Sequence, residues 1–186
     1  MFKESITLIN QWHQLTGQII QISVNLSPVQ FRYMDHCPWL PGLKQTGLPG
    51  HCINIEITEG LLLKDSPVVQ EFLLELRNSG IEVAIDDFGT GFSSLSYLKK
   101  FDIDYLKIDR SFINQLTEDA TDRALVEAII AMAHKLDIKT VAEGVETKEQ
   151  QDLLTQFGCD YIQGFYYSIP LQQSAFEQLL IEQSNN

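Results

Sequence analysis

VAIDDFGTGFSS, residues 83–94, ends an apolar run with two adjacent carboxylates, Asp86 and Asp87, directly before a Gly-x-Gly turn. A short run of apolar and β-branched residues is typical of a buried strand. Two negative charges at the end of such a strand are costly to bury without a partner. We therefore expect these two charges to have a partner, either a side chain at the end of another strand or a bound cation.

The same order of strand and then helix recurs along the chain. A candidate helix N-cap follows each of the first two β-branched runs, Ser27 after one and Ser66 after the next. Each is followed by a proline, Pro28 or Pro67, at the first helical position. Six such runs, each followed by a helix, predict parallel strands covered by helices, as a doubly wound sheet or a (β/α) barrel. The expected strands lie within residues 18–27, 52–58, 82–86, 105–109, 139–144 and 161–168.

Polar side chains lie at the carboxyl ends of nearly all these strands, where TIM-type barrels build their sites. We therefore favour an α/β fold of the TIM-type barrel class, in one domain over residues 1–186. A full barrel has eight strands and typically about 250 residues, so the six strands seen here predict an incomplete one. The strand-end residues are Asn25, Glu56 with Glu59, Asp86 with Asp87, Lys107 with Asp109, Glu143 with Glu146, and Gln163.

Composition excludes several classes of partner. The net charge of −12 argues against long nucleic acid and anionic membranes, because phosphates would be repelled over most of the surface. The three cysteines, Cys37, Cys52 and Cys159, have neither disulfide-framework nor zinc-site spacing. No targeting or membrane-spanning segment is recognisable, and we expect a cytoplasmic location.

If the strand ends converge, Asn25, Glu56 and Asp86 offer oxygen ligands, which suit Mg²⁺ or Mn²⁺ rather than zinc. Asp87 can turn toward a second ion, as in two-metal hydrolysis of phosphodiesters. Lys107 then supplies a fixed positive charge near a phosphate or a metal-bound water, and Glu143 is the candidate general base. These roles predict a hydrolase acting on a small phosphodiester.

Simpler explanations exist for each residue taken alone. A single Asp or Glu after a strand is more often a helix N-cap or a solvated loop residue. Gly89 and Gly91 lack the third glycine of a dinucleotide-binding fingerprint. His134 lies in an apolar helix and is expected to pack or to be partly solvated rather than to act in catalysis.

The quoted motifs resemble those of the EAL-domain family of cyclic di-GMP phosphodiesterases in bacterial signalling. The matching segments cover essentially the whole chain: VNLSPVQF, IEITEG, IDDFGTGFSSL, YLKIDRSF, VAEGVET and GCDYIQGFYYS. The resemblance implies a modified (β/α) barrel that hydrolyses cyclic di-GMP to linear pGpG with Mg²⁺ or Mn²⁺.

Carried over by motif, the resemblance assigns a role to each strand-end residue. It implies that Asn25, Glu56 and Asp86 bind one metal ion and that Asp87 serves a second. It also implies catalytic roles for Lys107 and Glu143. It implies that Glu59 holds the DDFGTG loop, that Glu146 supports the site, and that Gln163 lines it. The implied metal ligands are Asn25, Glu56, Asp86 and Asp87.

One family motif is absent from the 186 residues. The Glu-Ala-Leu signature is expected roughly sixty residues before the VNLS strand, whereas this chain starts only 24 residues before Asn25. We expect the first strand, its helix and one metal-ligating glutamate to be missing. Such a chain should be impaired in turnover and should self-associate through exposed strand edges or the DDFGTG loop.

Three functions remain open at this point. The first is a cyclic di-GMP phosphodiesterase, and the second is a non-catalytic module that binds the dinucleotide or another protein. A glycosidase using Glu56 and Glu143 ranks last, because it leaves Asn25, Lys107 and the Asp pair unexplained.

Overall fold

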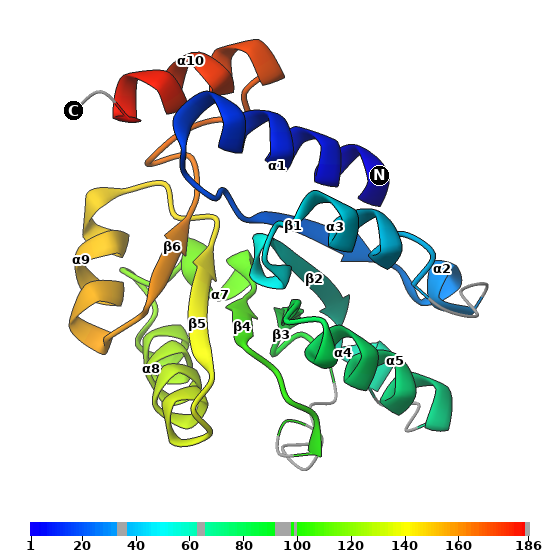
Figure 1. Ribbon diagram of the computed structural model, residues 1–186. Coiled ribbons are helices and arrows are strands. Elements are labelled where there is room, and N and C mark those ends of the chain that lie inside the picture. The colour runs from blue at the N-terminus through cyan, green and yellow to red at the C-terminus, as the bar shows by residue number, and fades with distance from the viewer. Residues whose placement is uncertain (33–36, 63–65, 92–97, 99, 185–186) are drawn as a thin grey trace.

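A single sheet of six parallel strands forms the centre of the computed structural model, which describes residues 1–32, 37–62, 66–91, 98 and 100–184. Each strand pairs with its neighbours in chain order (Figure 1). A doubly wound sheet reverses its strand order at a switch point, whereas this order is sequential, so the barrel prediction is confirmed. The strands are β1 (Ile22–Leu26), β2 (Ile53–Thr58), β3 (Glu82–Phe88), β4 (Tyr105–Ile108), β5 (Lys139–Glu143) and β6 (Tyr161–Gln163).

The described strands form an open half-barrel rather than a closed one. Within the described ranges, β1 pairs only with β2, and β6 pairs only with β5. Both edges of the sheet therefore present backbone groups that no described strand uses.

Helices follow the strands as the capping signals predict. Ser66 accepts a hydrogen bond from the Val69 N–H, and Thr147 forms a reciprocal capping box with Gln150. Gly17 ends the first helix in the left-handed conformation. The helices are α1 (Phe2–Thr16), α2 (Pro28–Arg32), α3 (Leu40–Thr46), the 3₁₀ helix η1 (Gly50–Cys52), α4 (Glu59–Leu62), α5 (Pro67–Asn78), α7 (Arg110–Asn114), α8 (Ala120–Lys135), α9 (Lys148–Phe157) and α10 (Gln173–Ser184).

The two faces of the sheet differ in polarity. Ile53, Ile55 and Ile57 of β2 are fully buried in the hydrophobic core, whereas Asn54 and Glu56 alternate with them and line a cavity on the concave face. This period of two is the strand pattern that separates an apolar outer face from a polar inner one. The apolar layer holds the helices, and the polar layer is free to build a site.

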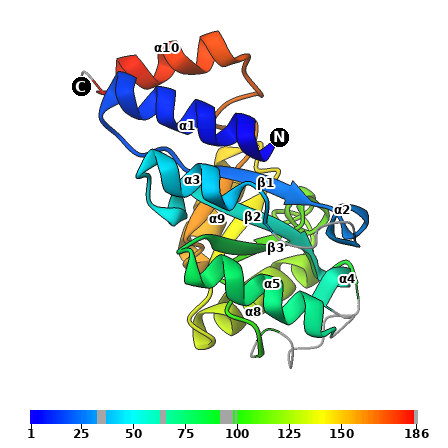
Figure 2. The ribbon, with the colours of Figure 1, turned by 45° about the vertical axis from the view of Figure 1, so that its right-hand side comes forward.

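The first and last helices pack against each other beyond β1, as both views show (Figures 1 and 2). The Trp12 ring lies 4.9 Å from the Phe176 ring, centroid to centroid, and its Nε1 donates a hydrogen bond to Glu177 at 3.1 Å. α10 is thus held against α1 by contacts between residues that are far apart in the sequence.

The last strand is shorter than the expected 161–168. It ends at Gln163, and Gly164 accepts hydrogen bonds from the N–H groups of Tyr167 and Ser168 in a turn. A side chain at residue 164 would overlap the Val145 carbonyl, so the chain crosses the loop after β5 here instead of extending β6. The helix expected over residues 91–101 lies largely outside the described residues.

No helix within the described ranges is both long and apolar enough to cross a bilayer.

A hydrogen-bonded junction joins the amino ends of β5 and β6. Asp160 accepts hydrogen bonds from the Thr140 N–H (2.8 Å), the Thr140 hydroxyl (2.9 Å) and His134 Nε2 (2.9 Å). Burial alone would raise the pKa of Asp160, but the hydrogen bonds from His134 and Thr140 outweigh it and hold that pKa below its usual value. His134, expected to pack or to be partly solvated, is partly exposed and engaged with this carboxylate.

We predict that Asp160→Asn lowers the free energy of unfolding at pH 7 by about 1–3 kcal/mol, since a charged acceptor is lost. Because the folded pKa of Asp160 is lowered, its contribution is present above the unfolded pKa of about 3.9 and is lost as pH falls through the folded value. Urea unfolding at pH 7, 5, 4 and 3 should therefore show the wild-type and variant curves converging below about pH 4.

Asp152→Asn is the matched control, because the partner of Asp152 among the described residues is the exposed Lys148 of the same helix. It should change stability by less than about 1 kcal/mol at any of these pH values. A gap between wild type and Asp160→Asn that is as wide at pH 3 as at pH 7 would show that the Asp160 charge plays no such part.

Candidate functional site

A buried ammonium group lies at the centre of the strand-end cluster. Lys107 of β4 is only 5% exposed, and its Nζ lies 2.9 Å from Glu56 Oε2, 2.9 Å from Asp86 Oδ1 and 2.6 Å from Glu143 Oε1. These three carboxylates come from β2, β3 and β5, so the curvature of the sheet brings four successive strands to one point. The sequence prediction that strand-end side chains converge is met for this set.

The charges in the cluster do not balance. Burial alone would lower the pKa of Lys107, but hydrogen bonds to Glu143 and Glu56 and the charge of Glu56 outweigh it, so the pKa is raised and the ammonium stays protonated. Burial raises the pKa of Glu143, and Lys107 opposes this shift without cancelling it. One ammonium thus faces three carboxylates, and the cluster favours a further positive charge.

Asp87 adds a fourth carboxylate beside the cluster. Oxygen atoms of Asp86, Asp87 and Glu143 lie within 4.8 Å of one another. Asp87 adopts a φ of 54°, a left-handed conformation that Asp tolerates better than most residues. Burial raises its pKa, and the carboxylates of Asp86 and Asp109 raise it further.

This donor set fits a hard divalent cation. All three side chains are carboxylates at mutual distances that one ion can bridge, and no histidine or cysteine belongs to the group. Oxygen-only ligands suit Mg²⁺ or Mn²⁺ rather than zinc. An ion bound there would supply positive charge to an anionic substrate and lower the pKa of a coordinated water.

Asn25 and Gln163 lie in register beside the cluster. Asn25 pairs with Glu56 across β1 and β2, and Gln163 pairs with Glu143 across β5 and β6. Residues in register on parallel strands point to the same face, so both side chains belong to the concave side. Within the described residues neither makes a side-chain hydrogen bond to the cluster.

Glu59 and Glu146 lie at the margin. Glu59 begins α4, and a side chain at Gly91 would come within 3.2 Å of its Oε2, so the carboxylate lies against the DDFGTG loop. Its oxygens accept no hydrogen bond from the described residues, and residues 92–97 of the loop lie outside that part of the chain. Glu146 is exposed, and its backbone N–H donates to Gln150 at 2.8 Å.

Two cavities border the cluster. One, of about 270 Å³, lies on the concave face and includes Glu56 and Lys107. The other, of about 420 Å³, lies at the rim and will be called the rim cavity. Its lining consists of Asp87, Asp109, Arg110, Asn114, Glu143, Gly144, Glu146, Gln163, Gly164 and Phe165.

The rim cavity contains two residues to which sequence reasoning gave no role. Asp109 was recognised only as a strand-end residue, and Arg110 was not singled out at all. Both follow directly after the strand YLKI, in the loop position where barrels place functional side chains. Their position directly after this strand is the sequence signal that could have identified them as candidate site residues.

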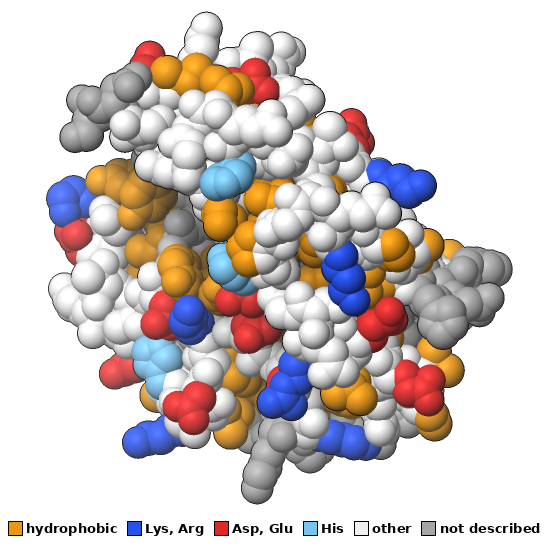
Figure 3. Space-filling model, in the orientation of Figure 1, with side chains coloured by type: hydrophobic (Ala, Val, Ile, Leu, Met, Phe, Trp, Pro, Cys, Tyr) orange, Lys and Arg blue, Asp and Glu red, His pale blue; other side chains and the backbone are white. Residues whose placement is uncertain are grey.

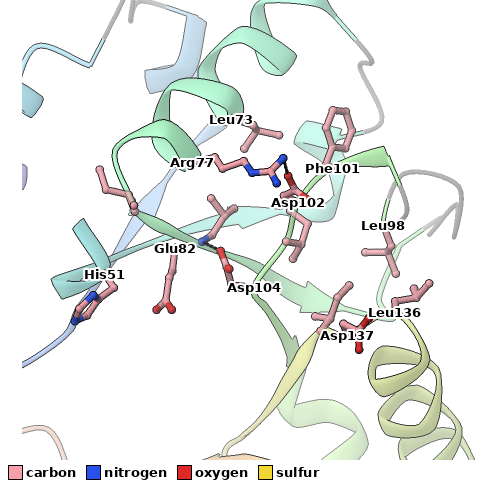
Figure 4. A pocket seen from close by; sticks show the side chains of 15 residues that line it. His51, Leu73, Arg77, Glu82, Leu98, Phe101, Asp102, Asp104, Leu136 and Asp137 are labelled. Carbon is pink, nitrogen blue, oxygen red and sulfur yellow. Dashed lines mark hydrogen bonds and ion pairs between the residues drawn. The ribbon is translucent and has the colours of Figure 1, made fainter. Parts of the chain in front are cut away.

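A larger cavity, of about 620 Å³, lies elsewhere (Figure 4). Its lining includes Glu82 at the start of β3 and Asp104 just before β4, so it opens at the amino ends of the strands. Arg77 and Asp102 form an ion pair there, and Asp104 accepts a hydrogen bond from the Val83 N–H at 2.8 Å. Several of its charged groups thus have structural partners, and we assign the chemistry to the carboxyl ends.

The surface shows no basic field on the face in Figure 3. Lys and Arg side chains are scattered there, several of them beside acidic ones.

Comparisons with known proteins find matches over most of the chain. A family model described as "EAL domain" matches residues 1–170. The chain is 41% identical over 173 residues to the signaling protein YkoW of Bacillus subtilis, covering 92% of the chain and 22% of YkoW. It is 44% identical over 161 residues to the bifunctional diguanylate cyclase/cyclic di-GMP phosphodiesterase MucR of Pseudomonas aeruginosa, covering 86% of the chain and 23% of MucR. The chain thus spans less than a quarter of either relative.

Solved structures agree with the fold. The EAL domain of Mycobacterium smegmatis DcpA matches with a TM-score of 0.86 and 37% identity, over 97% of this chain and 82% of that one. The c-di-GMP complex of the PaMucR phosphodiesterase matches with a TM-score of 0.83 and 37% identity, over 94% and 71%. A manganese/cyclic di-GMP complex of Klebsiella pneumoniae BlrP1 matches with a TM-score of 0.78 and 31% identity, over 90% and 43%.

We predict that Lys107→Met destabilises the fold by about 3–5 kcal/mol, because three buried carboxylates lose their common counter-charge. Adding Glu56→Gln to that variant should recover part of the loss, since one of the unpaired charges is removed. Urea unfolding of the two single variants and the double variant measures this coupling.

Lys148→Met serves as the control, because Lys148 makes an exposed ion pair with Asp152. It should cost less than about 1 kcal/mol. Equal losses for Lys107→Met and Lys148→Met, or strict additivity with Glu56→Gln, would contradict a charge-balancing role for Lys107.

Proposed function

The chain belongs to the EAL-domain family, and we propose from this premise that it acts on cyclic di-GMP as a metal-dependent phosphodiesterase, giving linear pGpG. One observation carries the proposal for this chain. Lys107 gathers carboxylates from three other strands, and two of these, with Asp87, lie within 4.8 Å of one another. The cluster borders the rim cavity, which a substrate can enter from solvent.

The proposed metal ligands follow from the strand-end positions and from the family motifs. Asn25, Glu56 and Asp86 would hold one divalent ion, and Asp87 would hold a second. Bound Mg²⁺ or Mn²⁺ supplies Lewis-acid stabilisation of charge on the phosphodiester and lowers the pKa of a bound water. The manganese and calcium complexes of BlrP1 with cyclic di-GMP support this choice of ion and ligand.

The remaining residues position and move the proton. Glu143 would accept the proton of the attacking water as the water oxygen bonds to phosphorus, while the P–O3′ bond breaks and the leaving O3′ takes a proton from solvent. Its raised pKa favours that role, since a base is most effective when its pKa approaches the working pH. Lys107 fixes Glu143 through the 2.6 Å ion pair, while Gln163, Glu59 and Glu146 support the site.

We propose that the 186-residue chain, as one partial EAL domain, turns over slowly by itself. Its sequence contains no Glu-Ala-Leu segment, and the described sheet leaves β1 and β6 open. A non-catalytic module that binds cyclic di-GMP is the second candidate, favoured by the same open sheet.

Self-association through the sheet edges is part of the proposal. Strand edges with free backbone groups recruit other strands. Beyond β6 the chain exposes Phe165, Tyr167 and Ile169, which are 61%, 56% and 64% exposed. The alternative contact surface is the DDFGTG loop.

Turnover and binding measured together test the assignment. With Mn²⁺ we expect slow hydrolysis of cyclic di-GMP, and Glu143→Gln should reduce it a further ~100-fold or more because the general base is lost. Calorimetry with Ca²⁺ should show cyclic di-GMP still bound by this variant. Glu149→Gln, on the exposed first turn of α9, should behave as wild type.

Each outcome separates the candidates. Binding without any turnover supports the non-catalytic module, and rapid wild-type turnover contradicts the proposed impairment. Absence of both binding and turnover contradicts the proposed substrate.

Light scattering tests association. The wild-type chain should form dimers or larger species as its concentration rises, and the double variant Tyr167→Lys/Ile169→Lys should shift the mass toward monomer because charge is placed beside the edge. Val68→Lys, at an equally exposed apolar position on α5, is the control. A purely monomeric wild-type chain would rule the association out.

A further inference from the structure

The rim cavity is strongly acidic except at one residue. Four carboxylates line it, those of Asp87, Asp109, Glu143 and Glu146, and Arg110 is its one basic side chain among the described residues. A cyclic dinucleotide carries two phosphates, and only one of them is cleaved in a single hydrolysis step. The other phosphate needs a separate source of positive charge, because the carboxylates would repel it.

Lys107 does not provide that charge. Its ammonium is almost fully buried and is held by Glu56, Asp86 and Glu143 at 2.6–2.9 Å. Reaching a ligand would mean breaking these ion pairs and leaving buried carboxylates unpaired. Among the described side chains that line the cavity, the cation available to a ligand is therefore Arg110.

The Arg110 guanidinium is free to accept a ligand within the described part of the chain. The side chain is exposed, lines the cavity, and has no hydrogen bond or ion pair to another described side chain. Asp109, its neighbour in sequence, instead accepts a hydrogen bond from the Ser111 N–H at 2.9 Å as the cap of α7.

Gly144 fixes where the Arg110 side chain begins. Gly144 has a φ of +71°, and a Cβ there would lie 2.7 Å from the Arg110 Cβ and 3.8 Å from its Cδ. The absence of a side chain at residue 144 thus lets the arginine stem pack directly against the loop after β5. This loop follows Glu143 directly, so the base of the arginine is tied to the carboxylate cluster.

We propose that Arg110 binds the non-reacting phosphate of the cyclic dinucleotide and thereby sets the affinity for substrate. The planar guanidinium presents paired N–H donors that match two phosphate oxygens, which a lysine ammonium cannot do with the same geometry. Arg110 acts as a substrate-binding residue, while proton transfer stays with Glu143. This inference rests on the proposed function and names the residue that holds the substrate there.

Calorimetry of the 186-residue chain with cyclic di-GMP in Ca²⁺ tests the proposal. Arg110→Gln keeps most of the stem against Gly144 and removes the charge, and it should raise Kd about tenfold or more. Arg110→Lys should raise Kd by only about threefold, because charge is kept and the bidentate geometry is lost. In the Mn²⁺ turnover assay Arg110→Gln should raise KM with kcat nearly unchanged, since the lost contact does not involve the cleaved bond.

Arg77→Gln is the matched control. It makes the same chemical change and the same change in net charge, but at the amino ends of the strands, where Arg77 forms an exposed ion pair with Asp102. Its Kd should stay within about twofold of wild type. Arg110→Met is a second neutral variant and carries the test if Arg110→Gln unfolds at lower urea concentration than wild type.

The outcomes are distinguishable. Wild-type binding with unchanged Kd in Arg110→Gln and Arg110→Met overturns the role of Arg110 and leaves the proposed function standing. An equal loss in Arg77→Gln overturns it as well, because the effect is then one of net charge. A wild-type chain that binds no cyclic di-GMP overturns both the proposed function and this inference.

Discussion

The organisation of the site depends on one buried ammonium shared by three carboxylates. Acidic groups at the ends of parallel strands repel one another when the sheet curves and brings them together. Lys107 removes most of that repulsion and fixes Glu56, Asp86 and Glu143 at ion-pair distance. The remaining excess of negative charge is what makes the cluster suited to divalent cations.

The two ends of the sheet differ in how their charged groups are paired. At the amino ends, charged groups pair with each other or with backbone N–H groups, as in the Arg77–Asp102 ion pair and the Asp160 junction. At the carboxyl ends, carboxylates outnumber cations and the side chains face cavities. The larger volume of the amino-end cavity is therefore a poor guide to function, and the imbalance of charge is a better one.

Much of this arrangement could be predicted from local sequence. Ser66, Thr147 and Gly17 marked helix ends because capping depends on a few adjacent residues. The strand-end positions of Glu56, Asp86, Lys107 and Glu143 followed from the repeated order of strand and helix.

The parts that were missed depend on contacts between distant segments. The early end of β6 follows from the close approach of Gly164 to Val145, which no local pattern encodes. Lys107 was expected near a phosphate or a metal-bound water, and the curvature of four strands shows in addition that three carboxylates share its ammonium. The freedom of Arg110 likewise depends on what surrounds it and on Gly144 in the loop after β5.

The alternation along β2 also bears on how the chain reaches this structure. Shifting a strand by a single residue exchanges its two faces. In β2 such a shift would move Glu56 into the hydrophobic core, where Ile53, Ile55 and Ile57 lie, and would move isoleucines into the polar cavity. Such an intermediate would bury a lone carboxylate among hydrocarbon and leave Lys107 without one of its acceptors. The charged cluster thus raises the free energy of misaligned strand pairings relative to the native register, and so favours correct strand alignment during folding.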